Sequence, residues 1–140
     1  MPCTARARQQ RAITGSGVFQ PTCGVVFAAP GEKTLYAAGD TVWYAGVRAA
    51  LDRYRPDVVV LNAADARFHD ETPILMGADG LYEVAMAAPQ ATIIAGHLDA
   101  VNHARLGRAG LREFVKARGL SERVRIPEDG EVCTFDERPL

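Results

Sequence analysis

Two short apolar runs constrain the fold of this chain more than any other feature. Residues 57–61 read Asp-Val-Val-Val-Leu and residues 91–95 read Ala-Thr-Ile-Ile-Ala, which is strand length and rich in β-branched side chains. Each run follows a proline, Pro56 or Pro89, that ends a helix pattern. Continuous apolar strands are typical of parallel sheets covered on both faces. The sequence therefore predicts an α/β fold around two buried strands.

The residues between these runs predict helices. Apolar side chains recur every three or four positions in the first of them, which places them on one helix face: Trp43, Val47, Leu51 and Tyr54. A second helix is expected from about Asp79, as N-cap or first-turn acid, to residue 88. Asn102 is the expected cap of a third helix, which ends at Gly119. The apolar positions of this helix are Leu106, Leu111, Phe114 and Val115.

The remaining strands lie on either side of this helical region. Apolar runs at 24–29 and 34–38 flank the turn sequence Pro-Gly-Glu-Lys and predict a hairpin. Residues 124–126 predict a short strand, and residues 132–135 predict a closing strand. The expected order is β-β-α-β-α-β-α-β, and alternation of this kind indicates the α/β class.

Composition excludes several kinds of protein. The chain has 140 residues, 48% of them hydrophobic and 24% charged, which is typical of one globular domain rather than a disordered protein. A net charge of -1 argues against binding to nucleic acid or to an anionic membrane. No apolar run reaches the roughly 20 residues that span a bilayer. The three cysteines, Cys3, Cys23 and Cys133, lie far apart and predict reduced thiols in a cytoplasmic protein, with a disulfide or a zinc site as the alternative.

The first residues differ from the rest of the chain. Arg6, Arg8 and Arg11 precede the first acidic residue, Glu32. We expect residues 1–23 to be a poorly ordered, arginine-containing segment, with an organelle transit peptide as the alternative. Residues 24–140 then form the folded unit.

Two polar insertions each follow a predicted strand. Asp40 and Thr41 come after residues 34–38, and His97 comes after residues 91–95. Each has a simpler interpretation, since Asp40 or Thr41 suits a helix cap and a lone histidine is often structural. Strand ends of an α/β sheet also meet at one edge, where ligands bind. A carboxylate and an imidazole there would suit zinc, manganese or iron, with Asp99 or His103 orienting the His97 ring.

A set of short motifs resembles a known family. The runs Lys-Thr-Leu-Tyr-Ala-Ala-Gly-Asp-Thr at 33–41, Tyr-Arg-Pro-Asp-Val-Val-Val-Leu at 54–61, Met-Gly-Ala-Asp at 76–79 and Ala-Gly-His at 95–97 resemble the C-terminal half of metallo-β-lactamase-fold hydrolases. The ascorbate-6-phosphate-lactonase-like branch is the most similar. The resemblance covers residues 24–130.

This resemblance implies one half of an αββα sandwich with a two-metal site, holding zinc or manganese, at one edge. Asp40 would correspond to the bridging aspartate and His97 to the last histidine ligand. Thr41, Asp99 and His103 would surround these ligands, and no residue is assigned as catalytic.

The chain also departs from the family pattern. It has three histidines, none of them in the family's His-x-His-x-Asp-His motif, and residues 12–20 lack a further expected histidine. Zinc sites usually take at least three protein ligands, so we expect an incomplete site that binds metal weakly. The resulting hypothesis is a truncated or degenerate hydrolase that cleaves a small-molecule ester, lactone or phosphate only if the missing ligands come from elsewhere.

The alternative hypothesis is a non-catalytic interaction module. Half a sandwich leaves one sheet face uncovered, which favours a homo-oligomer or a complementary half-domain as partner. In this interpretation Asp40 is a cap, His97 is structural and Ile93 lies on the uncovered face. A flavodoxin-like nucleotide binder is disfavoured, because Gly15 and Gly17 are not followed by a helix pattern.

Overall fold

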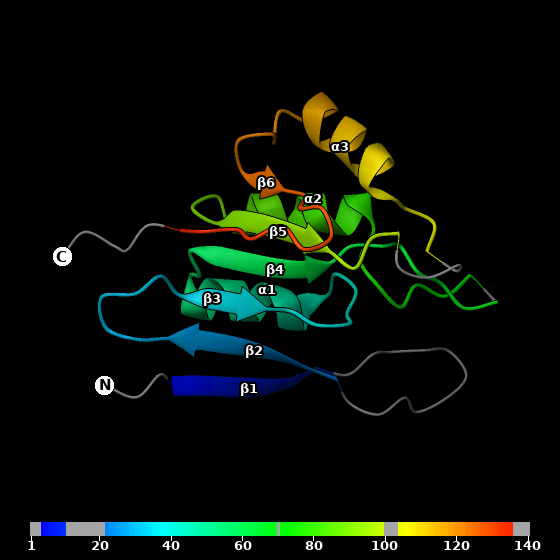
Figure 1. Cartoon of the computed structure of the whole chain (residues 1–140). Helices are drawn as coiled ribbons and strands as arrows, with labels where there is room; N and C mark the ends of the chain where they lie inside the picture. Colours follow the sequence, from blue (N-terminus) through cyan, green and yellow to red (C-terminus); the bar gives the residue numbers. More distant parts are fainter. Residues whose placement is uncertain (1–3, 11–21, 70, 100–103, 136–140) are drawn as a thin grey trace.

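The computed structural model describes residues 4–10, 22–69, 71–99 and 104–135. Within these residues the chain forms a six-stranded sheet and three helices (Figure 1). The elements follow one another as β1 Thr4–Gln10, β2 Thr22–Ala28, β3 Leu35–Ala37, α1 Ala45–Tyr54, β4 Val58–Asn62, α2 Ala78–Ala87, β5 Thr92–Gly96, α3 Arg108–Ala117 and β6 Val124–Arg125. The strands lie in the sheet in chain order, with β1–β2–β3 antiparallel and β3–β4–β5–β6 parallel.

The predicted α/β class and the order of elements from β2 onward are confirmed. Strand β1 was not predicted and lies within the segment expected to be poorly ordered. The division of the chain at residue 23 stays a prediction. Each of the three helices in the described part has ten residues, fewer than a bilayer crossing requires.

Some predicted boundaries are wrong. Helix α1 has Tyr44 as its N-cap, and α3 has Gly107, so Trp43 and Leu106 precede the helices to which the apolar period assigned them. Both side chains still pack against the core from the preceding loop, which is why the period included them. The expected cap Asn102 lies outside the described residues. Asp79 is confirmed as a first-turn acid of α2.

The predicted closing strand at 132–135 is also wrong. These residues have no regular structure, and side chains of β6 hold them instead. Arg125 Nη1 donates a hydrogen bond to Thr134 O at 3.1 Å, and its guanidinium lies 4.7 Å from the Phe135 ring centroid. The segment is therefore held by the Arg125 side chain and not by the backbone hydrogen bonds of a strand.

All three helices pack against the same face of the sheet. Crossovers between parallel strands are right-handed, so strands added in one direction place every connecting helix on one side. A row of paired residues runs across that face from β2 to β6 and is buried under the helices: Val26, Tyr36, Val59, Ile93 and Val124. Leu51, Leu81 and Leu111 supply the facing side chains from α1, α2 and α3.

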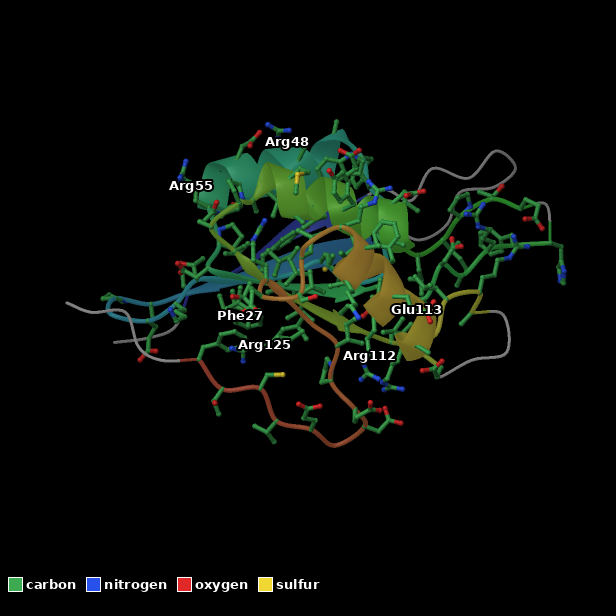
Figure 2. All side chains as sticks on the ribbon, turned by 90° about the horizontal axis from the view of Figure 1, so that it is seen from above. Phe27, Arg48, Arg55, Arg112, Glu113 and Arg125 are labelled. Carbon is green, nitrogen blue, oxygen red and sulfur yellow. The ribbon has the colours of Figure 1, made fainter. Side chains whose placement is uncertain are left out.

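The opposite face of the sheet, here called the open face, carries apolar side chains that are half-buried or exposed: Val25, Phe27, Leu35, Ala37, Val60 and Ile94. Figure 2 shows Arg48 of α1 and Arg55, the C-cap of α1, on one side of the sheet and Phe27 and Arg125 on the other. The sequence predicted that residues 57–61 and 91–95 are covered on both faces, and for Val60 and Ile94 this is wrong in the described structure. Ile93 was assigned to the wrong face, because it is fully buried against the helices.

Candidate metal centre

Three neighbouring parallel strands bring the candidate side chains to one edge of the sheet. Asp40 follows β3, Asn62 ends β4, and His97 follows β5. Asn62 pairs in register with Gly96, and Ala63 N donates a hydrogen bond to Gly96 O at 3.1 Å. Asp40 and His97 therefore follow strands that lie on either side of β4 and are about 10 Å apart by the usual spacing of strands.

Asn62 connects this edge to Asp40. Its Nδ2 donates a hydrogen bond to Asp40 Oδ1 at 2.6 Å. This role of Asn62 was not predicted from the sequence. Its position as the polar last residue of an apolar strand was the available signal, but the pairing with Asp40 depends on the sheet register.

The backbone before Asp40 requires glycine. Gly39 has φ +72°, in the left-handed region, and a Cβ there would come within 3.3 Å of Cys23 O. The chain thus turns sharply out of the sheet, and the carboxylate of Asp40 is exposed at its edge.

Neither Asp40 nor Thr41 caps helix α1, so the capping interpretation is wrong. The N-cap position belongs to Tyr44. Thr41 is buried, and its hydroxyl donates a hydrogen bond to Val42 O at 3.1 Å. This bond holds the turn between β3 and α1, directly after Asp40.

His97 is exposed where β5 ends, and its backbone is also left-handed, with φ +60°. Asp99 has φ +58°, and its Oδ2 accepts hydrogen bonds from the backbone N and the Nη1 of Arg108, both at 3.1 Å. The carboxylate expected to orient His97 thus holds the start of α3. His103, the other predicted neighbour, lies outside the described residues.

A cavity lies between the loops that follow these strands. Its volume is about 320 Å³, and residues after β3, β4 and β5 all line it, among them Trp43, Arg67, Met76 and Arg105. This volume suits a small organic molecule.

The donor types at the sheet edge fit a metal ion, but their number does not. Carboxylate and imidazole are ligands of zinc and manganese, and a protein site needs at least three of them. Among residues 4–10, 22–69, 71–99 and 104–135, no group of three or more His, Cys, Asp or Glu side chains could hold an ion. The described residues alone therefore do not form a metal site.

Comparisons with known proteins also indicate that this chain corresponds to part of longer proteins. No protein-family model matches the sequence. The UPF0173 protein YddR of Bacillus subtilis (strain 168) is 45% identical over 113 residues, which cover 81% of this chain and 44% of that protein.

Two solved structures share the fold closely. An isothiocyanate hydrolase from Delia radicum gut bacteria is 35% identical with a TM-score of 0.88, over 95% of this chain and 55% of that one. A possible metal-dependent hydrolase from Veillonella parvula is 34% identical with a TM-score of 0.87, over 95% of this chain and 54% of that one. This chain thus spans about half the length of the proteins it matches.

Proposed function

This chain belongs to the metallo-β-lactamase-fold superfamily, and from that premise we propose that it is one half of a metal-dependent hydrolase. Its relatives of known structure are described as hydrolases, and its fold is one β/α half of the family's αββα sandwich. The observation that carries the proposal is the placement of Asp40 and His97 at the same sheet edge, with Asn62 between them.

In this proposal Asp40 and His97 supply two ligands to a zinc or manganese site, and a complementary half-domain supplies the others. The half-domain would pack on the open face, where apolar rows cross four strands. The matched proteins are about twice as long as the covered region, which leaves enough chain for a second half of this size.

We propose a small-molecule ester, lactone or phosphate as substrate, in keeping with the lactonase-like motifs. The cavity of about 320 Å³ between the loops that follow β3, β4 and β5 supports a small substrate, and neither Asp40 nor His97 is among its lining residues. An isothiocyanate belongs in the same test panel, because a neighbour at 35% identity is described as hydrolysing one. A cytoplasmic location is supported by Cys23 and Cys133, which are free thiols.

Coexpression tests the proposal. This chain would be produced together with the part of YddR that it does not match, purified through a tag on one partner, and analysed for metal content and hydrolysis of the panel. We expect a complex with bound zinc or manganese, whose content falls when Asp40→Asn or His97→Ala is introduced. His69→Ala is the matched control, since His69 is exposed in the β4–α2 loop.

A complex whose metal content is unaffected by Asp40→Asn and His97→Ala would refute the proposed ligands. Stoichiometric metal in this chain alone would refute the need for a second half.

The second candidate is an interaction module that pairs with another copy of itself. The apolar open face is the observation that favours it. Sedimentation of the chain alone and the metal analysis of the coexpressed complex together separate the two. A stable dimer of the chain, with no metal bound in the coexpressed sample, would support this module and contradict the hydrolase.

A further inference from the structure

The segment that carries His97 has an unusual backbone. His97 and Asp99 both have positive φ angles although neither is glycine, and Leu98 between them is buried. Residues other than glycine rarely adopt a positive φ unless the surrounding structure holds the backbone in that conformation. The contacts of residues 97–99 therefore determine where the His97 imidazole is presented.

Arg108 makes those contacts. Its Nη1 donates hydrogen bonds to Leu98 O at 3.4 Å and to Asp99 Oδ2 at 3.1 Å, and its backbone N donates to the same carboxylate oxygen. Only 15% of the Arg108 side chain is exposed. The Asp99 side chain is 50% exposed, so the guanidinium is the buried partner of this pair.

The other side of the guanidinium is anchored to the turn after β6. Nε donates to Pro127 O at 2.9 Å, and Nη2 is paired with the carboxylate of Asp129. The planar guanidinium thus joins two segments that flank α3, and its position is fixed from both sides.

Gly107 makes room for the Asp99 carboxylate. A Cβ at this position would lie 2.3 Å from Asp99 Oδ1. As the N-cap of α3, Gly107 also has no side chain to cap the helix, and Asp99 binds the first helical N–H in its place. The capping bond and the Arg108 ion pair therefore depend on the same carboxylate.

We infer that Arg108 is a positioning residue for His97: through its contacts with Leu98 and Asp99 it holds His97 and Asp99 in their left-handed backbone conformation. The conformational part of this inference concerns the chain alone. Its consequence for metal binding rests on the proposed function.

The first test uses the full 140-residue chain. Backbone NMR chemical shifts and heteronuclear NOEs of residues 97–99 would be compared in wild type, Arg108→Met, Arg108→Lys and Gly107→Ala. Arg112→Met is the matched control, because Arg112 binds Ile126 O and Glu128 of the same turn but not the 97–99 segment. We expect Arg108→Met and Gly107→Ala to shift φ of His97 and Asp99 away from positive values, Arg108→Lys to do so partly, and Arg112→Met to leave them unchanged.

If Arg108→Met does not fold, Arg108→Lys and Gly107→Ala decide the result. Unchanged φ angles at His97 and Asp99 in those variants would overturn the inference. So would an equal change in Arg112→Met.

The second test measures zinc affinity of the coexpressed complex by competition with a chelator. Removing a residue that orients a ligand typically costs about 10–100-fold in metal affinity, so we expect that loss for Arg108→Met and none for Arg112→Met. Equal zinc affinities would overturn the positioning role. A complex that binds no zinc in any variant would contradict the proposed function and leave the NMR result standing.

Discussion

The guanidinium of Arg123 supports the C-terminal end of α2. Its Nη2 lies 3.0 Å from Ala85 O, 2.7 Å from Ala88 O and 3.4 Å from Ala91 O. Ala85 O belongs to the last turn of α2, whose carbonyls have no partner within the helix, and Ala88 O and Ala91 O follow that turn. The cation therefore binds the carbonyls at the helix end and interacts favourably with the helix dipole. Arg123→Met keeps most of the apolar stem and removes the donor.

The size of the effect follows from two opposing contributions. A hydrogen bond to a charged donor contributes about 1.5–3 kcal/mol, and the two shorter contacts count fully here. Nε of Arg123 is buried without a partner in the described part of the chain. Because Arg123→Met also removes this unsatisfied donor, about 1–3 kcal/mol of the lost stability is offset. We therefore expect Arg123→Met to lower the free energy of unfolding by about 2 kcal/mol.

Urea unfolding measures this difference, with fluorescence of the single tryptophan, Trp43, and circular dichroism as probes. Arg118→Met is the control. Arg118 is exposed and lies 4.7 Å from the Tyr82 ring centroid, a contact that contributes about 0.5–1 kcal/mol. If Arg123→Met costs no more than Arg118→Met, the reasoning about the helix end is refuted.

Three further predictions concern the candidate site and the open face. Gly39→Ala should lower the free energy of unfolding by about 1–2 kcal/mol in the same urea assay, because Ala must adopt φ +72°; an unchanged midpoint would contradict the need for glycine. Asn62→Leu and Asp40→Ala should show a coupling of about 0.5–1.5 kcal/mol in a double-mutant cycle, and additive effects would mean that their hydrogen bond contributes nothing to stability. Ile93→Asp should unfold the chain, since Ile93 is fully buried, whereas Ile94→Asp should leave it folded by circular dichroism and abolish copurification with the complementary half. Retained copurification would exclude the open face as the docking surface.

Much of the fold could be predicted because burial follows local pattern. The apolar runs at 57–61 and 91–95 and the hairpin at 24–38 correspond to observed strands. The errors at the helix starts have one physical cause: a hydrophobic period reports which side chains are buried, not the backbone that carries them. Trp43 and Leu106 reach the core from loops and so lengthened the predicted helices.

The candidate site divides in the same way. Asp40 and His97 could be located because a polar residue directly after an apolar strand is visible in one sequence. Asn62 and Arg108 could not, because their roles depend on partners 22 and 21 residues away, Asp40 and Asp129. Asp99 was assigned to the nearest histidine, whereas the folded chain brings the start of α3 to it.

The order of strands in the sheet has a consequence for how the protein is made. Each strand lies beside the one synthesised just before it, from β1 to β6. As the chain leaves the ribosome, each new strand can therefore pair with the strand synthesised just before it. In the described sheet, pairing of an early strand does not depend on a strand made much later. Assembly can proceed in the direction of translation, one β/α unit at a time.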